Sequence, residues 1–503
     1  MGAQTGGAMN ANSGNYDYYC GFGKVSFDGF INENYFSIDS QEKNLLENLE
    51  IYHGISKNPF NYKKNIFLGL FIKSKYDGIG NRKPIDLSIA LDISGSMSSI
   101  DGNSEGNSRI KLAKESLKKL VSIMDDKNDK ISLVTFNHKI NKIFGLLKKD
   151  EIQNKYLNDI DSIKANGGTD LYGAIEFAMK NFDENKKNNK ERRVVVITDD
   201  VYNDQDNNLF NLIKECVENN NISLTIMAIS SSANLTLADK ICHFKGCNYF
   251  TITNCSELET YLVKNFNYIF FPISYNNKII VKSKNAKILK CIGGGNDLFD
   301  EIEKKNENEK IPSNEFYYDI GTCFSSDLIK INEKLYMNGG LILLQIDNDY
   351  PKNENLNFDI TLEYESINNI KSTQNYFYEI PNNEQENEFF KNINIRKGIS
   401  IYYFSSILNY IVEKLNKNYY IVNGNAMEKN NDQKEKDVKL IESKEVIREY
   451  LEKNFIKDCD VTKKNYENYL KLLEERYNNY KKVIFKFYCI PDNAAPPVIM
   501  NNN

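Results

Sequence analysis

The sequence predicts an α/β domain with a doubly wound, mostly parallel sheet, inserted in a β-sandwich and followed by a helical C-terminal region. Three observations support this prediction: strand-like and helix-like segments alternate between about residues 85 and 270, short strand-like runs lie on both sides of that stretch, and helical periodicity dominates after residue 386. Strands that alternate with helices of about 10–15 residues imply parallel strands joined by crossover helices.

The α/β stretch begins with the apolar-rich run Ile85–Leu91, and the run Val194–Ile197 is apolar throughout, as expected of strands buried on both faces. The segment between them at 109–124 places Ile110, Leu117 and Leu120 at helical spacing on one face. Further strands are expected at 130–136, 142–147, 222–230 and 247–252, and further helices at 150–163, 171–182, 208–218, 233–244 and 256–268.

The flanking segments have a different pattern. Residues 276–380 hold short strand-like runs separated by Gly, Asn and Pro, which is typical of antiparallel strands, and residues 16–80 contain two more such runs. We expect these two segments to form one β-sandwich. The chain then divides into a disordered N-terminus (1–15), an N-terminal β segment (16–80), an α/β domain (81–272), a second sandwich segment (273–383), a helical region (384–490) and a tail (491–503).

The composition limits the classes of partner. The chain of 503 residues has a net charge of −5, and its lysines are interspersed with Asp, Glu and Asn, whereas a nucleic-acid surface needs clustered basic side chains. No apolar run approaches the roughly 20 residues that cross a bilayer, and the N-terminus lacks the basic and apolar regions of a signal peptide. The nine cysteines include no Cys-x-x-Cys pair, so we expect reduced thiols in a cytoplasmic protein.

Polar side chains gather where ligands bind in open α/β sheets, beyond the carboxyl ends of the strands. One cluster follows the first strand, a second lies in the loop before the helix at 171–182, and a third follows the strand at 192–198. The three clusters comprise Asp92, Ser94 and Ser96, then Thr169 and Asp170, then Thr198, Asp199 and Asp200.

The residue types in these clusters favour a cation site. Hydroxyl and carboxylate oxygens are hard ligands that suit Mg²⁺ or Ca²⁺ rather than zinc or copper. The spacing of Ser94 and Ser96 lets both hydroxyls point the same way in an extended loop, and Gly95 relaxes the backbone between them. Asp92 and Asp199 can hold waters or orient the serines. We therefore expect a hydroxyl-rich site for a divalent cation.

Other interpretations of the first cluster fit the sequence less well. A polar loop would explain Asp92, Ser94 and Ser96 alone, but not the matching residues after other elements. A nucleophilic serine is disfavoured because DISGS does not fit Gly-x-Ser-x-Gly, and of the three histidines only His138 lies near this end of the sheet. The chain contains no Walker sequence for a phosphate-binding loop.

The sequences DISGSM, GGT and VVVITDD resemble the von Willebrand factor A domain and its metal-ion-dependent adhesion site, over about residues 85–270. The resemblance implies a doubly wound α/β fold and cation-dependent ligand binding, often through an acidic residue of the partner. The β-rich flanks are similar to those of members in which this domain is inserted in a β-sandwich. The resemblance assigns the metal site to Asp92, Ser94, Ser96, Thr169 and Asp199, with Mg²⁺, or Ca²⁺ or Mn²⁺, as the bound ion.

Two features depart from the family pattern. The insertion SSIDGNSEGNS separates the first motif from its helix and adds Asp101 and Glu105, and Asp200 stands where the family usually has glycine. With Asp170, these acidic residues are expected to modulate the choice of ligand, because negative charge favours a cation and repels an acidic partner.

These patterns together predict a non-enzymatic protein–protein interaction module that binds a protein partner through the cation. An alternative is a non-catalytic accessory subunit of a ubiquitin-ligase or ATP-driven complex, since the chain itself has no RING-type cysteine array and no ATPase loop. A third class is a metal-dependent hydrolase with Asp199 or Asp200 as the base. Cation-dependent capture of a partner distinguishes the first class, co-purification with an ATPase or ligase the second, and product release the third.

Overall fold

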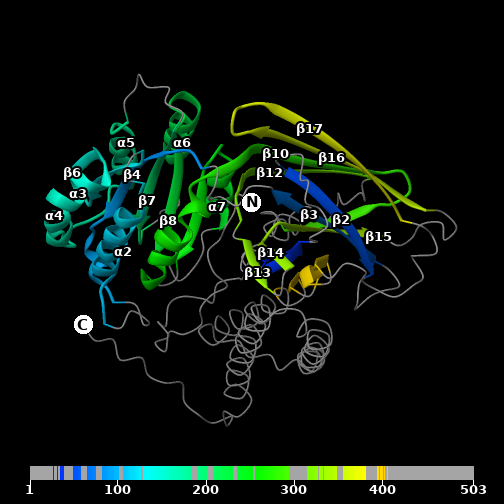
Figure 1. Ribbon diagram of the computed structural model, residues 1–503, viewed down its shortest axis with the longest axis horizontal. Coiled ribbons are helices and arrows are strands. Elements are labelled where there is room, and N and C mark those ends of the chain that lie inside the picture. The colour runs from blue at the N-terminus through cyan, green and yellow to red at the C-terminus, as the bar shows by residue number, and fades with distance from the viewer. Residues whose placement is uncertain are drawn as a thin grey trace, which may run out of the picture. The chain divides into compact units, whose positions relative to one another are not determined.

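The structure is a computed structural model, and it describes part of the chain (Figure 1). The described residues are 27, 31, 34–38, 49–57, 65–74, 82–100, 106–125, 128–182, 190–200, 208–229, 235–252, 255–293, 314–326, 328–331, 334–347, 355–380, 394, 395, 397–399, 401, 402 and 405. The chain divides into two compact units. The first comprises Met1–Tyr16 and Ser26–Tyr402, and the second comprises Asp17–Val25 and Tyr403–Asn503. Of the second unit only Ser405 is described. Every helix within the described residues is too short or too polar to span a lipid bilayer.

Six strands form the central sheet in the order β6-β5-β4-β7-β8-β9. Their bounds are β4 Ile85–Asp92, β5 Lys130–Phe136, β6 Ile140–Leu147, β7 Glu191–Thr198, β8 Ser223–Ile229 and β9 Asn248–Ile252. Neighbouring strands pair in parallel except β5 and β6. From β4 the chain builds outward to β6 on one side and then to β9 on the other. The predicted doubly wound, mostly parallel sheet is therefore confirmed, with β6 as its antiparallel edge strand.

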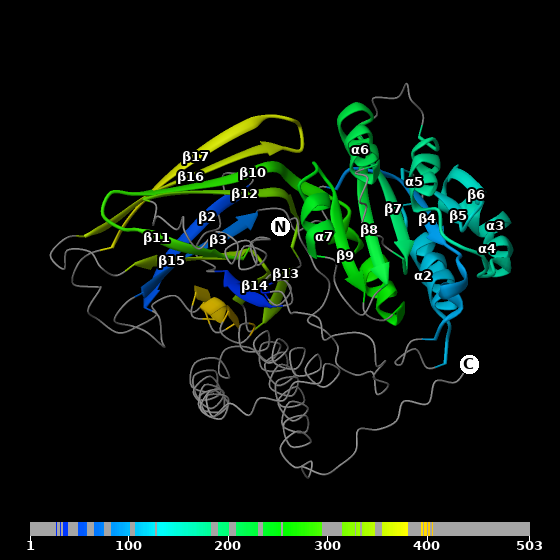
Figure 2. The same ribbon diagram turned by 180° about the vertical axis from the view of Figure 1, so that it is seen from behind.

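Helices cover both faces of this sheet (Figures 1 and 2). The apolar positions of α2, α3 and α4 join one buried cluster with alternate residues of β4, and those of α5, α6 and α7 join a second cluster on the opposite face. The helices are α2 Arg109–Ile123, α3 Lys149–Lys155, α4 Leu157–Ser162, α5 Leu171–Met179, α6 Asn208–Lys214 with its π-helical continuation Glu215–Asn219, and α7 Leu235–Cys242. Because successive strand residues point to opposite faces, a strand buried on both faces serves both clusters.

The predicted helix at 256–268 is interrupted. This segment forms a 3-10 turn at Cys255–Glu257, a π-helical turn at Thr260–Lys264 and the short helix α8 at Phe266–Ile269. Asn265 has φ −97° and ψ 13°, outside the α-helical region, and its N–H donates to Thr260 O, five residues earlier, so the regular α-helical hydrogen-bond pattern is interrupted there. The prediction of one continuous helix was wrong, and β10 begins directly after this segment at Pro272.

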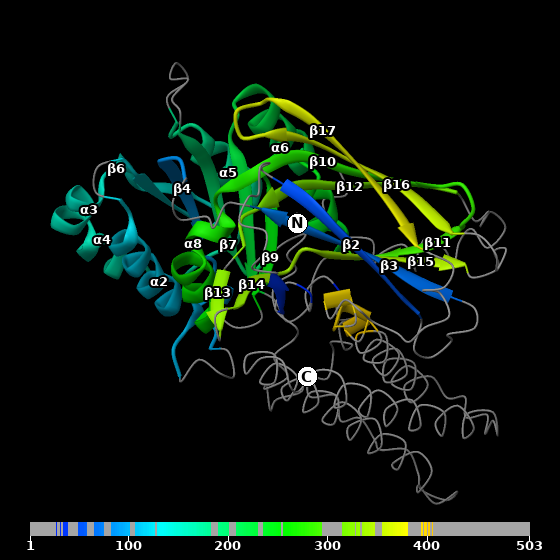
Figure 3. The same ribbon diagram turned by 45° about the vertical axis from the view of Figure 1, so that its right-hand side comes forward.

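Two antiparallel sheets of four strands share a buried cluster (Figure 3). One has the order β12-β10-β16-β17 and the other β11-β15-β3-β2. The strands are β2 Leu49–Lys57, β3 Asn65–Ser74, β10 Pro272–Ser283, β11 Ile288–Ile292, β12 Glu315–Phe324, β15 Leu341–Asp347, β16 Leu356–Ser366 and β17 Lys371–Ile380. Thus strands that precede the α/β domain in the sequence pair with strands that follow it.

A third sheet has the order β1-β14-β13, with β1 Tyr35–Ile38, β13 Leu328–Ile331 and β14 Lys334–Asn338. The strand-like run expected at 16–27 lies outside the described residues except Phe27, which is helical, so the strand prediction was wrong there. The N-terminus at 1–15 and the tail at 491–503 also lie outside the described residues. Of the region predicted to be helical, 384–490, the structure describes eight residues between 394 and 405, all of them helical.

Polar contacts join the end of α7 to the first of the four-stranded sheets. Lys245 Nζ lies 2.6 Å from Glu365 Oε1 in β16 and also donates to Asn369 Oδ1 at 3.0 Å. The backbone N–H of the next residue, Gly246, donates to the hydroxyl of Thr322 in β12 at 2.8 Å. These bonds connect residues far apart in the sequence, so they tie the α/β domain to this sheet.

Glu365→Gln is expected to lower the free energy of unfolding by about 1 kcal/mol at pH 7. Burial alone would raise the pKa of Glu365, but the hydrogen bond and charge of Lys245, with a hydrogen bond from Asn276, hold this pKa below its ordinary value of 4.5. A carboxyl whose pKa is lowered by folding stabilises the protein above its unfolded pKa, and this contribution is lost as the pH falls through the folded pKa. The difference between the two proteins should therefore shrink below about pH 4.5.

Urea unfolding across this pH range measures the effect. Glu363→Gln, two residues earlier in β16, removes the same charge without touching Lys245 and serves as the control. If Glu365→Gln lowers the free energy of unfolding by the same amount at pH 7 and at pH 3, the ion-pair explanation is contradicted.

Candidate cation-binding site

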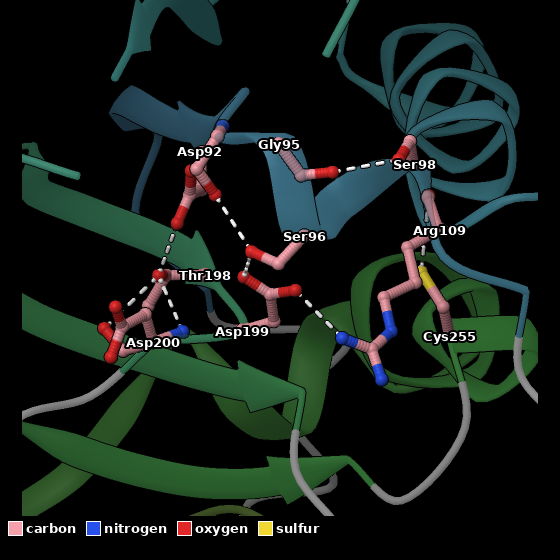
Figure 4. A network of polar contacts seen from close by, with 10 residues as sticks. Asp92, Gly95, Ser96, Ser98, Arg109, Thr198, Asp199, Asp200 and Cys255 are labelled. Atoms are coloured by element: carbon pink, nitrogen blue, oxygen red, sulfur yellow. Dashed lines mark hydrogen bonds and ion pairs between the residues drawn. The ribbon is translucent and has the colours of Figure 1, made fainter. Parts of the chain in front are cut away.

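The predicted site lies at the carboxyl ends of β4 and β7, which are neighbours at the centre of the sheet (Figure 4). Leu91 is level with Ile197 in the parallel register, so the last residues of the two strands, Asp92 and Thr198, lie side by side at this edge of the sheet. The order of the strands thus brings together two polar segments that are separated by about a hundred residues in the sequence.

Asp92 is fully buried and both of its carboxylate oxygens accept hydrogen bonds. The backbone N–H of Ser94 donates to Oδ1 at 2.7 Å, and the hydroxyl of Thr198 donates to Oδ2 at 2.6 Å. Burial raises the pKa of Asp92, and these hydrogen bonds partly oppose that rise. The structure therefore holds a carboxylate in a place where its charge is costly unless a positive charge lies nearby.

Ser94 and Ser96 bring their hydroxyls together, with 3.0 Å between the two Oγ atoms. Ser96 donates its proton to Asp199 Oδ1 at 2.8 Å, so Ser94 is the donor in the contact between the two serines. Adjacent ligands of an octahedral ion with bonds of about 2.1 Å are separated by about 3.0 Å, which matches this spacing. The serine pair thus has the oxygen chemistry and the spacing that Mg²⁺ requires.

The loop that carries GGTD packs on the first motif through its backbone. Gly95 N–H donates to Gly167 O at 2.9 Å, and Asn166 N–H donates to Ile93 O at 2.7 Å. Gly167 has a φ of +82°, and a Cβ at this position would lie 2.6 Å from His138 Nδ1. Only glycine fits this turn without strain, which explains the residue type at 167.

Thr169 and Asp170 follow this turn, and the structure gives them different roles. Thr169 is half-buried and makes no hydrogen bond with the serines or with the carboxylates of Asp92 and Asp199, all of which are described residues. Asp170 caps α5, because its Oδ1 accepts the N–H of Gly173 at 3.0 Å. The backbone contacts bring the loop of Thr169 to the site, whereas Asp170 uses its carboxylate to begin a helix.

Asp199 is the second buried carboxylate of the site, with 1% of its side chain exposed. Its Oδ1 accepts from Ser96, and its Oδ2 lies 2.6 Å from Nη1 of Arg109, the first residue of α2. The next residue, Asp200, contacts the site through its backbone, with its N–H donating to the Thr198 hydroxyl at 3.1 Å. The structure thus brings four of the five predicted ligands into one hydrogen-bonded chain.

The sequence places Thr198 in the third polar cluster but assigns it no role, and it does not indicate Arg109 at all. The position of the Thr198 hydroxyl at the end of a strand was a signal that it could reach the neighbouring strand. Arg109 offered no signal, because an arginine at the start of an amphipathic helix is common on solvated surfaces.

The two ends of the SSIDGNSEGNS insertion, which precedes α2, are bonded to each other. Ile100 and Ser108 form an antiparallel bridge, and Arg109 N–H donates to Ser99 O at 2.9 Å. Asp101 and Glu105, which were predicted to modulate ligand choice, lie outside the described residues. The closed ends of the insertion place Arg109 directly after it.

The donors present fit a hard divalent cation. Hydroxyl and carboxylate oxygens make up the site. Such oxygens are the ligands that hard divalent cations prefer. Within the described residues, no group of three or more His, Cys, Asp and Glu side chains is placed to hold a metal ion, so any cation here would depend on the serine hydroxyls.

Comparison with known proteins identifies one domain. Residues 87–201 match a family model for the von Willebrand factor type A domain. No curated protein sequence matches the chain. The matched residues include Asp92, Ser94, Ser96, Thr169 and Asp199, together with Arg109.

Three solved structures that match the chain differ in how much of each chain the match covers. The ArnB paralog VWA2 from Sulfolobus acidocaldarius is 15% identical, with a TM-score of 0.42 over 88% of this chain and 98% of that chain. A von Willebrand factor type A protein from Catenulispora acidiphila is 11% identical, with a TM-score of 0.43 over 76% of this chain and 84% of that one. Proximal thread matrix protein 1 from the mussel byssus, with a zinc-occupied metal-ion-dependent adhesion site (MIDAS) motif, is 17% identical. Its TM-score is 0.30 over 37% of this chain and 46% of that one.

Proposed function

Because the chain contains a von Willebrand factor type A domain over residues 87–201, we propose that it is a non-enzymatic interaction protein that binds a partner protein through a divalent cation. Domains of this family commonly mediate protein–protein interaction. The observation that carries the proposal is the pair of serine hydroxyls 3.0 Å apart, with the Ser96 hydroxyl bonded to Asp199 and the Ser94 backbone N–H bonded to Asp92.

Ser94 and Ser96 would bind the cation directly, and Thr169 would approach it from the neighbouring loop. Asp92 and Asp199 would balance its charge and orient the serines through the hydrogen bonds already present. Mg²⁺ is the ion we propose, with Mn²⁺ or Ca²⁺ as substitutes. When bound, it would supply a coordination position for a carboxylate of the partner, because neutral hydroxyl ligands leave much of its charge uncompensated.

The arrangement of the carboxylates supports a binding role rather than catalysis. Both oxygens of Asp92 and both oxygens of Asp199 accept hydrogen bonds or an ion pair. Carboxylate oxygens that are all engaged in this way have no free position from which to take a proton from a substrate or a water molecule, which argues against a general base. We therefore propose that the chain has no catalytic activity of its own.

The remaining parts of the chain would serve as scaffold or as a second interface. We propose that the two four-stranded sheets form a β-sandwich into which the α/β domain is inserted, since β3 pairs with β15 and both sheets share one buried cluster. We also propose a cytoplasmic location, which the six described cysteines support because all are buried and none of the six forms a disulfide.

Capture of partners from a native extract tests the proposal. The 503-residue chain is immobilised in Mg²⁺ or in EDTA. Beside it are a Ser94→Ala, Ser96→Ala double variant and a control variant, Ser122→Ala, whose hydroxyl lies on α2 and donates to a backbone carbonyl. We expect proteins retained only by the wild type and the control, and only in Mg²⁺. Retention of the same proteins by all variants and in EDTA would refute a cation-mediated contact.

A further inference from the structure

A guanidinium group lies against the cation site. Arg109 Nη1 is 2.6 Å from Asp199 Oδ2, and the carboxylate is buried while the arginine side chain is 24% exposed. The backbone of Arg109 is fixed on both sides, because its N–H donates to Ser99 O and its carbonyl accepts from Cys255 Sγ at 3.3 Å. Figure 4 shows the side chain extending from the start of α2 to Asp199.

The two oxygens of Asp199 thus face different groups. Oδ1 is bonded to the hydroxyl of Ser96, a predicted metal ligand, and Oδ2 is bonded to Arg109. A charge-assisted bond of this length between largely buried groups is strong, and arginine does not lose its proton in proteins. Asp199 Oδ2 can therefore bind a metal directly only if that ion pair is broken, and Oδ1 only if the hydrogen bond from Ser96 is broken.

Arg109 also places a fixed positive charge beside the position of the cation. Like charges repel strongly where burial reduces screening by water and salt. The guanidinium neutralises one of the two carboxylates that would otherwise attract a divalent ion. Its expected effect is to weaken cation binding while leaving the bound ion more attractive to a carboxylate from outside.

We propose that Arg109 acts as an internal cation that keeps Oδ2 of Asp199 from the bound metal and lowers the affinity of the site for divalent cations. This inference rests on the proposed function, because it concerns the same site. It assigns a specificity-determining role to a residue outside the adhesion-site motif.

Titration of Mn²⁺ into the metal-free 503-residue chain by calorimetry tests the inference. Arg109→Gln is expected to bind Mn²⁺ at least about tenfold more tightly than the wild type, because Asp199 regains its charge and a repelling group is removed. Arg109→Lys keeps the positive charge and should stay within about threefold of the wild type. Lys118→Gln is the matched control, since it removes a positive charge from the same helix, where Lys118 pairs with Asp161.

The outcomes separate the two proposals. If the wild type binds Mn²⁺ and Arg109→Gln binds it equally or more weakly, the role of Arg109 is refuted and the metal site stands. If neither protein binds Mn²⁺ at millimolar concentration, the metal site and the role of Arg109 both fail.

A crystal structure of the Mn²⁺-loaded wild type gives a second test that does not depend on the folding of a variant. We expect Arg109 to remain bonded to Asp199 Oδ2, so that this oxygen does not contact the metal. Asp199 Oδ2 bound to Mn²⁺, with Arg109 displaced, would overturn the inference.

Discussion

Asp92→Asn is expected to weaken Mn²⁺ binding by about 10–100-fold while leaving the metal-free protein as stable as the wild type or more stable. Asp92 is fully buried, and burial raises its pKa, so its ionised form is costly in the absence of a cation. Asparagine keeps the volume, its carbonyl can still accept the Ser94 N–H, and its amide can donate to the Thr198 hydroxyl. The charge that attracts the cation is lost, but the cost of burying it is lost as well.

Calorimetric titration with Mn²⁺ and urea unfolding in EDTA measure the two effects separately. Asp161→Asn, which removes a half-exposed carboxylate beside Lys118, is the control and should change neither quantity much. Unchanged Mn²⁺ affinity together with a clear loss of stability in EDTA would show that Asp92 only supports the fold.

Arg193→Ala is expected to destabilise the protein by about 3–5 kcal/mol. Arg193 in β7 is fully buried, and its guanidinium contacts Glu191 Oε1 and Thr225 Oγ1, each at 2.9 Å. It also lies over the rings of Phe270 and Phe324, at 6.0 Å and 5.8 Å from the ring centres. Truncation leaves the carboxylate of Glu191 without its cation and opens a cavity between the two aromatic rings.

Urea unfolding followed by far-ultraviolet circular dichroism measures this loss. Arg192→Ala changes the adjacent residue of the same strand, which is only partly buried, and is the control. Phe324 belongs to β12 and Arg193 to the central sheet, so the variant also tests whether the central sheet packs against the sheet that contains β12 in solution. A loss smaller than about 1 kcal/mol would contradict the tight packing of this arginine.

Local sequence patterns were sufficient to predict the central sheet. Strand and helix periodicity is set by residues close together in the chain, and parallel strands joined by helices follow from their alternation. For the same reason DISGSM could be placed at the end of a strand, where it lies in the structure. The break at Asn265 was not predicted, because it depends on how one helical turn packs against α2 rather than on the spacing of its apolar residues.

The sequence by itself determined the oxygen chemistry of the site: Asp92, Ser94 and Ser96 follow one strand within five residues, and their types and spacing are fixed by the chain. Only the tertiary structure decided what faces Asp199. Arg109 is separated from it by 90 positions, and the two meet because the closed insertion starts α2 beside the end of β7. A contact between distant residues depends on the packing of whole elements, and no local pattern specifies it. The motif therefore predicts a cation site, and the fold adds a positive charge to that site.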